Sequence, residues 1–374
     1  SRRWLPTPCP FSPAPGISAA MIYLDYQATT PLAPEAFAAM EPWLKTGFAN
    51  PHSAHAAGRA AAAAVEVARD QVAALLPTGG RVIFTSGATE AINLAIMGCG
   101  LPVSAAATEH AAVLDCVHAR HGDVLPVSVT GALVKPFGSG DANEECRLFA
   151  VMLVNNEIGT LQPIAEIAAA LHGQGGLLLC DAVQAFGRMH IPNGPDMIAI
   201  SAHKMHGPKG IGALWVRDGI LLTPQMLGGG QEQGMRSGTL SPALCAGFGA
   251  AAKLAADRME ADAAHVATLW NHAMAAFSDW TINGSATARY KGNLNIRRDG
   301  VDAARLISEC RNIAFSAGSA CASGSGRPSH VLRAIGLTDA QAKSSIRLGF
   351  GRYTTVKEID IAAHAINRAA EAML

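Results

Sequence analysis

Short apolar segments alternate with stretches of helical periodicity through the first two-thirds of this chain. The helical spacing is clearest after Pro163, where Ile164, Ile167, Ala168 and Leu171 share one face. Five apolar segments have strand length: Val82–Thr85, Val103–Ala107, Leu148–Val154, Leu177–Cys180 and Met197–Ile200. This alternation predicts an α/β fold, in which a mostly parallel sheet is flanked by helices on both faces.

Beyond Pro242 the pattern changes to that of a smaller α+β domain. Helices are expected over Ala243–Ala276, Asp302–Asn312 and Thr355–Met373, strands over Asn293–Ile296 and Ser344–Leu348, and a loop over Ala314–Gly326. Upstream, Ile22–Asp25 reads as extended, and helices are expected from Pro34 to about Leu44 and from Arg59 to Leu76. We therefore expect a leader at 1–20, an N-terminal segment at 21–35 that packs with the small domain, a large domain at 36–242 and a small domain at 243–374.

Composition and charge exclude several classes of protein. Lys and Arg together number 29, as do Asp and Glu, so no basic excess indicates nucleic acid or an anionic membrane. No apolar run approaches the roughly 18–20 residues of a membrane span. The eight cysteines form no C-x-x-C pair and no zinc pattern with histidine. They indicate a reducing, cytoplasmic compartment, and we expect no metal, although His52 and His55 lie close in sequence.

Polar residues follow the carboxyl ends of five predicted strands. In open α/β sheets ligands bind at that edge. The residues in question are Ser86–Glu90, Thr108–His110, Asn155–Glu157, Asp181–Gln184 and Ser201–Lys204. Because each group carries different chemistry, solvated loops explain them poorly, and we expect one site.

Lys204 and Asp181 are the most informative of these residues. A lysine at the mouth of a buried strand either reaches back to solvent or is a reactive amine of lowered pKa. Asp181 follows an apolar strand, so it is either a helix N-cap or a buried carboxylate that needs a cation, such as a protonated pyridine nitrogen. Ser86–Glu90 is an ordinary N-cap or a phosphate site at a helix N-terminus.

Three further residues have equally open interpretations. His110 is either a capping histidine or a ring that stacks on a planar cofactor and exchanges protons. Cys321 lies among Ser, Gly and Ala residues, so it is an incidental thiol or a nucleophile on a mobile loop. Arg347 suits a carboxylate, although a single arginine is more often part of a surface ion pair.

Taken together, these stretches resemble the cysteine desulfurases of the NifS/IscS group, which are class V aminotransferase-like enzymes of fold-type I. The resemblance runs from about Tyr23 to Thr355. It is carried by residues 23–30 (Tyr-Leu-Asp-Tyr-Gln-Ala-Thr-Thr), 50–53 (Asn-Pro-His-Ser), 84–90 (Phe-Thr-Ser-Gly-Ala-Thr-Glu), 108–110 (Thr-Glu-His), 155–159 (Asn-Asn-Glu-Ile-Gly), 181–184 (Asp-Ala-Val-Gln), 201–204 (Ser-Ala-His-Lys), 235–239 (Met-Arg-Ser-Gly-Thr) and 318–321 (Gly-Ser-Ala-Cys).

The resemblance implies pyridoxal 5'-phosphate (PLP) as cofactor and a role for each matching residue. Lys204 would hold the cofactor and move the Cα proton, His110 would stack on the ring and handle protons, and Cys321 would attack the substrate sulfur. Asp181 would pair with the ring nitrogen and Gln184 with the ring oxygen. The phosphate would bind Ala88, Thr89, Ser201 and His203, together with Thr239 from the other subunit of a homodimer. Asn156 would contact cofactor and substrate, and Arg347 the substrate.

The implied function is conversion of L-cysteine to L-alanine, with a persulfide left on Cys321 for a sulfur-acceptor protein, of which an iron–sulfur scaffold is one candidate. The chain departs from the family at Gln233, where relatives often have arginine, at the poorly matching 123–147, and in ending at Leu374 without a longer scaffold-docking tail. The alternatives are a selenocysteine lyase or another fold-type I lyase, a serine acyl-enzyme built on S-x-x-K at Ser201–Lys204, and a non-catalytic scaffold.

Overall fold

The computed structural model describes residues 21–134, 146–318 and 329–374. Its largest sheet has seven strands in the order β2-β8-β7-β6-β5-β3-β4. Strands β7, β6, β5, β3 and β4 are parallel neighbours, whereas β8 runs antiparallel to both β2 and β7. The strands are β2 (Gly80–Thr85), β3 (Val103–Ala106), β4 (Asp123–Leu125), β5 (Leu148–Met152), β6 (Leu177–Asp181), β7 (Met197–Ser201) and β8 (Gly212–Arg217). The mostly parallel sheet that the sequence predicts is therefore confirmed.

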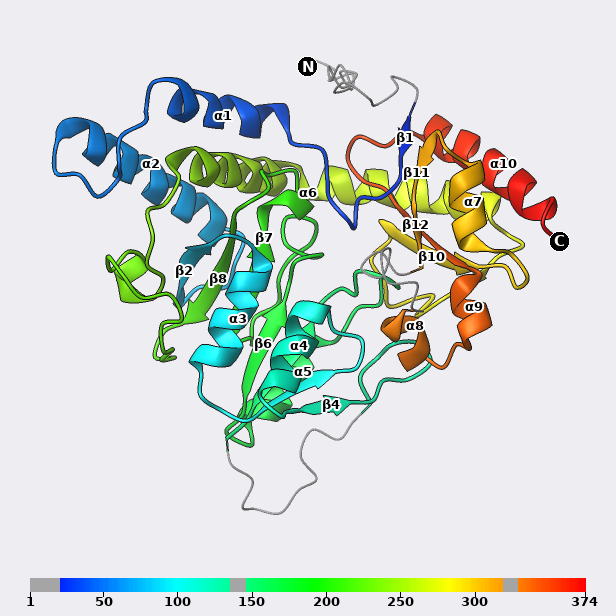
Figure 1. The fold of residues 1–374 in the computed structure, drawn as a ribbon, viewed down its shortest axis with the longest axis horizontal. Coiled ribbons are helices and arrows are strands. Elements are labelled where there is room, and N and C mark those ends of the chain that lie inside the picture. Colours follow the sequence, from blue (N-terminus) through cyan, green and yellow to red (C-terminus); the bar gives the residue numbers. More distant parts are fainter. Residues whose placement is uncertain (1–20, 135–145, 319–328) are drawn as a thin grey trace.

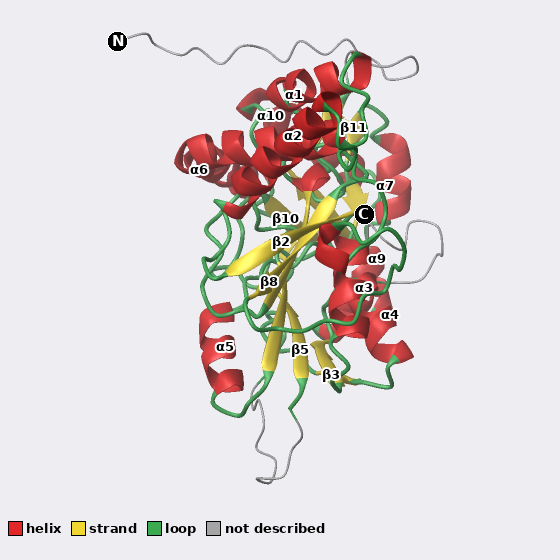
Figure 2. Ribbon diagram, turned by 90° about the vertical axis from the view of Figure 1, so that its left-hand side faces the viewer, coloured by secondary structure: helices red, strands yellow, loops and turns green. Residues whose placement is uncertain are grey.

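Both faces of this sheet are buried by helices, as Figure 2 shows with α5 on one side of the strands and α3 and α4 on the other. Ile198 and Ile200 of β7 pack in one apolar cluster, with α2 (Ala56–Ala73), α5 (Ile164–His172) and the first half of α6 (Pro242–Ala276). Ala199, between them, packs in a second cluster with α3 (Ala88–Gly98) and α4 (Ala111–Ala119). Successive strand side chains point to opposite faces, so a continuous apolar run is what a strand covered on both sides requires.

A second body of structure is built around a four-stranded sheet of order β12-β13-β10-β9. Its strands are β9 (Thr281–Ile282), β10 (Asn293–Arg297), β12 (Ser316–Ala317) and β13 (Ser345–Gly349), and its helices are α7 (Ala303–Glu309), α8 (His330–Ala334), α9 (Asp339–Lys343) and α10 (Val356–Glu371). Separately, β1 (Ile22–Tyr23) pairs in parallel with β11 (Ile313–Ala314). The N-terminal segment then leads into α1 (Pro34–Lys45), which lies along α6 (Pro242–Ala276) (Figure 1).

Helix α6 connects the two bodies along its length (Figure 1). Phe248 and Ala252 in its first half lie in the cluster beneath the large sheet. Leu269 and Trp270 in its second half lie in the cluster of the small sheet. The division of the chain at 242/243 remains a prediction, and the structure adds that one helix belongs to both cores.

Most sequence-based elements agree with the structure to within a few residues, with clear exceptions. Strand β8, the antiparallel member of the sheet, was not predicted, nor were β4 and β9. The helix expected over Asp302–Asn312 ends at Glu309, where the chain turns toward β11. The loop expected over Ala314–Gly326 is wrong at its start, because residues there pair with β1 and β13. Residues 319–326 of that loop lie outside the described residues.

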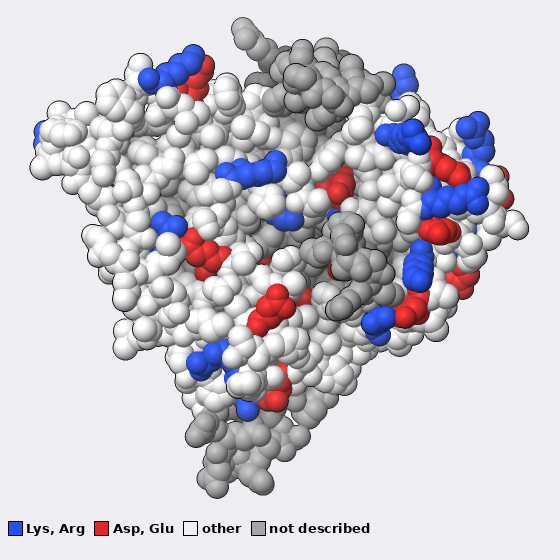
Figure 3. Space-filling model, viewed as in Figure 1, with Lys and Arg blue, Asp and Glu red and all other residues white. Residues whose placement is uncertain are grey.

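Charges of both signs are interspersed on the face shown in Figure 3, where they gather on the side of α7, α9 and α10. In the described part of the chain, no helix is long and apolar enough to cross a membrane. Across those same ranges, no group of three or more His, Cys, Asp or Glu side chains could hold a metal ion. His55 instead caps α2, since its Nδ1 accepts the Gly58 N–H at 3.1 Å.

Candidate active site

A cavity of about 520 Å³ lies at the carboxyl ends of the central strands. Its walls include every residue to which the family resemblance gives a role, except Thr239 and Cys321. These residues are Ala88, Thr89, His110, Asn156, Asp181, Gln184, Ser201, His203, Lys204 and Arg347. Thr239 is exposed and lies elsewhere, as a role toward another subunit would require, and Cys321 lies outside the described residues.

Asp181, at the end of β6, is a buried carboxylate. Its Oδ1 accepts the Val183 N–H at 2.9 Å, and no helix begins there, so the helix N-cap interpretation is wrong. Burial raises the pKa of Asp181, while hydrogen bonding and the nearby His110 and Lys204 oppose that rise. The described part of the chain gives this carboxylate no ion pair. A cation placed in the cavity would supply one.

Lys204 follows β7 in a single turn of 3-10 helix over Ala202–Lys204. Its Nζ donates to the carbonyl oxygens of Gln27 and Ala28, the latter at 2.8 Å. Gln27 and Ala28 of the N-terminal segment also line the cavity, so this segment holds the amine at the cavity wall. Lys204 points into the site, as the reactive-amine interpretation requires, and does not simply reach solvent.

Burial favours the neutral form of both histidines of the site. Burial lowers the pKa of His110, and its Nδ1 accepts the Ala112 N–H at 3.1 Å, which makes it the N-cap of α4. The capping interpretation is confirmed, and the ring proton of neutral His110 belongs on Nε2. Burial, aided by Lys204 and Lys209, lowers the pKa of His203 to about 4.

The N-terminus of α3 forms one end of the cavity. Its N-cap is Gly87, which has no side chain to bond to the first-turn N–H groups, and Glu90 instead accepts the Ser86 N–H at 2.7 Å. Strand β8 approaches this turn so closely that a Cβ on Gly212 would lie 2.8 Å from the Gly87 backbone. Uncapped N–H groups of this kind suit a phosphate.

Arg347 reaches the cavity from the small sheet. It is almost fully buried, and its Nη2 donates to Asp25 Oδ1 at 2.7 Å while its Nη1 donates to the carbonyl oxygen of Asn156 at 3.0 Å. Its Nε is buried and has no hydrogen-bond partner among the described residues. The usual interpretation of a lone arginine, a surface ion pair, is therefore wrong here.

Several residues of the site were not singled out in advance. Gln27 and Ala28 bond to Lys204 and belong to the matching block at 23–30, whereas Arg188, which bonds to Gln184, belongs to no matching block. Met152 and Val154 line the cavity as apolar strand residues. For Arg188, only its spacing of four residues from Gln184 could have indicated that the two side chains meet. That spacing indicates contact within a helix, and the structure has a turn there that is not helical.

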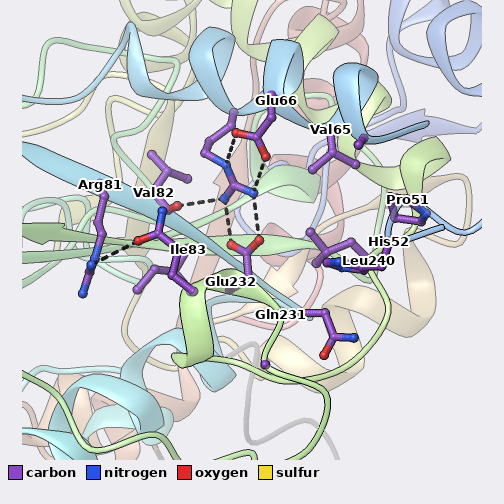
Figure 4. A pocket seen from close by; sticks show the side chains of 14 residues that line it. Pro51, His52, Val65, Glu66, Arg81, Val82, Ile83, Gln231, Glu232 and Leu240 are labelled. Atoms are coloured by element: carbon purple, nitrogen blue, oxygen red, sulfur yellow. Dashed lines mark hydrogen bonds and ion pairs between the residues drawn. The ribbon is translucent and has the colours of Figure 1, made fainter. Parts of the chain in front are cut away.

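A separate cavity of about 300 Å³ lies beside β2 and α2. Figure 4 shows Glu66 and Glu232 facing one guanidinium, which belongs to Arg69. Glu232 also accepts the Phe84 N–H at 2.7 Å. Among the described residues that line it, none is a predicted catalytic residue.

A lysine, a buried carboxylate and an uncapped helix N-terminus at one edge of a mostly parallel sheet are the features that a pyridoxal-phosphate enzyme of fold-type I requires. The family model for class-V aminotransferases matches residues 22–361. The chain belongs to this family, whose members use PLP, and the resemblance and fold class inferred from the sequence are confirmed.

The relatives are consistent with one another. A cysteine desulfurase IscS of Rickettsia bellii (strain OSU 85-389) is 43% identical over 370 residues, covering 92% of this chain and 90% of the relative. The crystal structure of a NifS-like protein from Rickettsia africae ESF-5 is 29% identical with a TM-score of 0.85, covering 94% of this chain and 99% of the other. A structure described as SspA in complex with cysteine is 31% identical with a TM-score of 0.78, and the match covers 89% of this chain and 100% of the other.

Proposed function

We propose that this chain is a PLP-dependent cysteine desulfurase that converts L-cysteine to L-alanine and keeps the sulfur as a persulfide on Cys321. One observation carries the proposal: a single cavity places Lys204 and Asp181 together with Arg347. The structural relative described with bound cysteine and the relatives named cysteine desulfurases support the choice of substrate.

The residues present fit the cofactor. The Asp181 carboxylate, which the described chain leaves without an ion pair, would pair with the ring nitrogen, and Lys204 would hold the aldehyde carbon. The N-terminus of α3, with Ser201 and His203, would hold the phosphate. When bound, PLP supplies an electron sink for the carbons of an attached amino acid.

Arg347 suits the carboxylate of an amino-acid substrate. Its Nε carries a proton that no described group accepts, although Asp25 and the Asn156 carbonyl already bond to the two terminal nitrogens. An arginine buried at a cavity wall binds a planar carboxylate strongly. The Lys204 amine would then remove the substrate's Cα proton, and neutral His110 would hold a proton on Nε2.

The sulfur step balances without an external oxidant. The Cys321 thiolate forms an S–S bond with the substrate sulfur as the Cβ–S bond breaks. The electron pair of the broken bond stays with the substrate carbons, which take up protons to give alanine. The sulfur is oxidised and the Cβ carbon is reduced, so cysteine and one thiol become alanine and one persulfide. A sulfur-acceptor protein, such as an iron–sulfur scaffold, would then receive the outer sulfur.

The assembly and compartment are part of the same proposal. Thr239 is exposed and does not line its own chain's cavity, which supports a homodimer in which it serves the other subunit. The six cysteines of the described part, from Cys99 to Cys310, are free thiols, which supports a reducing compartment such as the cytoplasm.

The test is to compare C321A with C146A, which removes another thiol that is exposed. The purified chain should absorb visible light as a lysine-bound PLP enzyme and release sulfide from L-cysteine when a reductant is present. We expect C321A to keep the absorption and lose at least roughly a hundredfold in sulfide release, because none of the described free cysteines lines the cavity. C146A should retain both properties. Sulfide release that survives in C321A would exclude Cys321 as the nucleophile, and a chain without PLP absorption would exclude the cofactor.

A further inference from the structure

Arg188 lies behind the wall of the active-site cavity and bonds to three separate segments of the chain. Its Nη1 donates to Gln184 Oε1 at 2.8 Å, and its Nη2 donates to the carbonyl oxygen of Tyr26 at 3.1 Å and to that of Lys204. Gln184 and Lys204 line the cavity, whereas Arg188 does not. The guanidinium therefore contacts two residues of the proposed site without reaching the cavity itself.

The acceptors of Arg188 are all neutral. Across the described ranges it forms no ion pair, and its guanidinium packs against the ring of Tyr290, 5.5 Å from the ring centre. Desolvation lowers the pKa of this arginine, which is the reverse of what an ion pair would do. A partly buried cation without a carboxylate partner costs stability.

The contact with Gln184 determines which end of that amide faces the cavity. A guanidinium carries only donors, so the amide oxygen must point toward Arg188. The amide nitrogen then points the other way and donates to the Gln27 carbonyl at 3.0 Å, the same oxygen that accepts from Lys204 Nζ. Reversing the amide would place two donor groups against each other. The orientation of Gln184 is therefore set by Arg188.

We propose that Arg188 is a positioning residue for the cofactor site: it presents the Gln184 amide nitrogen to the cavity and holds the backbone of Lys204. The inference rests on the proposed PLP function. Its consequence is that loss of the Arg188 donors should change how PLP is bound, beyond any loss of stability. A donor facing the cavity stabilises an oxygen of negative character on the bound ring, so the change should be visible in the absorption spectrum and its pH dependence.

The experiment uses R188M and R188K, with R289M as the matched control. Arg289 is also buried, donates to the carbonyl oxygens of Ser285 and Asn293, and packs on the Trp270 ring at 4.7 Å, yet it does not line the cavity. The dissociation constant for PLP, the pH midpoint of the visible absorption band and the thermal unfolding of the PLP-free chain are measured for each variant.

We expect R188M to weaken PLP binding by about tenfold and to shift the absorption midpoint, with R188K in between, because lysine keeps the charge but not the fork of donors. In a Q184A background, R188M should add less than about a threefold loss, because the orienting contact is already absent. R289M should lose stability but retain the dissociation constant and the midpoint.

The outcomes are distinguishable. R188M and R188K that lose only thermal stability, as R289M does, would overturn the positioning role. If R188M does not fold, R188K alone and combined with Q184A decides between the same outcomes. Failure of the unsubstituted chain to bind PLP would overturn the proposed function itself, whereas normal binding with unaffected Arg188 variants would overturn only this inference.

Discussion

At the scale of single residues, His110 shows how a structural role and a chemical role share one side chain. Its Nδ1 satisfies a free N–H at the start of α4, which fixes the ring and leaves the proton on Nε2. The sequence presented capping and proton exchange as competing interpretations. The structure shows that the cap occupies only one of the two nitrogens, so the proposed proton role uses the other.

His206 is the residue from which we predict a pH effect on stability. It is buried, donates through Nδ1 to the Pro31 carbonyl at 2.9 Å, and burial together with Arg352 and Arg188 lowers its pKa to about 3. The unfolded chain therefore takes up this proton first as the pH falls below about 6.5. Stability is fully present above that pH and is lost toward pH 3, by at most about 1.4 kcal/mol per pH unit for this site.

The variant to test is H206N. Asparagine tolerates the left-handed backbone at this position, where φ is +70°, and its amide nitrogen can donate to Pro31, but it takes up no proton. Urea unfolding at pH 7 and pH 5 should show a smaller loss of unfolding free energy in H206N than in the unsubstituted chain. The exposed His118, changed to Asn, is the control and should leave the pH dependence unaltered. Equal pH dependence in H206N and the unsubstituted chain would contradict the prediction.

At the scale of secondary-structure elements, the sequence predicts those whose pattern is local and fails for those defined by distant partners. The buried face of α5 is the predicted set of Ile164, Ile167, Ala168 and Leu171. Strands β11 and β12 have two residues each and exist because β1 and β13 pair with them. Two residues are too few to show a periodic pattern, so the sequence of β11 and β12 indicates a loop. Strand β8 is a continuous apolar run. Its residue pattern does not indicate whether the strand runs parallel or antiparallel to its neighbours.

An ion pair joins α2 to residues 228–240, and it leads to a prediction about the free energy of unfolding. Glu232 and Gln233 both have left-handed backbone, with φ of +50° and +57°, which is unfavourable for residues other than glycine. The Glu232 carboxylate is buried and pairs at 2.7 and 2.8 Å with Arg69, which α2 carries (Figure 4). The buried pair therefore holds the strained turn in place.

We expect R69M to lower the free energy of unfolding by about 3–5 kcal/mol, because it leaves a buried carboxylate without its cation. The control is E66Q, which alters the exposed partner of the same arginine and should cost less than about 1 kcal/mol. Combining R69M with E232Q should recover part of the loss, since the amide oxygen still accepts the Phe84 N–H. Urea unfolding measures all three variants, and a cost for R69M no greater than for E66Q would contradict the assignment.

At the scale of the whole molecule, the site depends on contacts between segments that are far apart in sequence. Arg347 and Asp25 are 322 residues apart and form an ion pair at the cavity. Lys204 bonds to carbonyl oxygens of the N-terminal segment, 177 and 176 residues earlier. Residue types and family resemblance could predict which side chains belong to the site. They could not predict that the N-terminal segment lines the cavity or that Arg188 bonds to Tyr26 and Lys204, because backbone carbonyls accept these bonds and carry no sequence signature.

Helix α6 provides the last prediction, because it is the element that both cores share. Glu260 is exposed near its middle, between Ala255, which packs under the large sheet, and Val266, which packs in the small core. Proline there removes one helical hydrogen bond and clashes with the preceding turn, at a cost of about 3 kcal/mol or more.

E260A keeps the helix and is the control. If the chain has two cores divided near 242/243, E260P should separate calorimetric unfolding into two transitions, while E260A unfolds like the unsubstituted chain. A single transition in E260P, merely shifted to lower temperature, would mean that the cores cooperate through contacts other than α6, and the division predicted from the sequence would not describe how this chain unfolds.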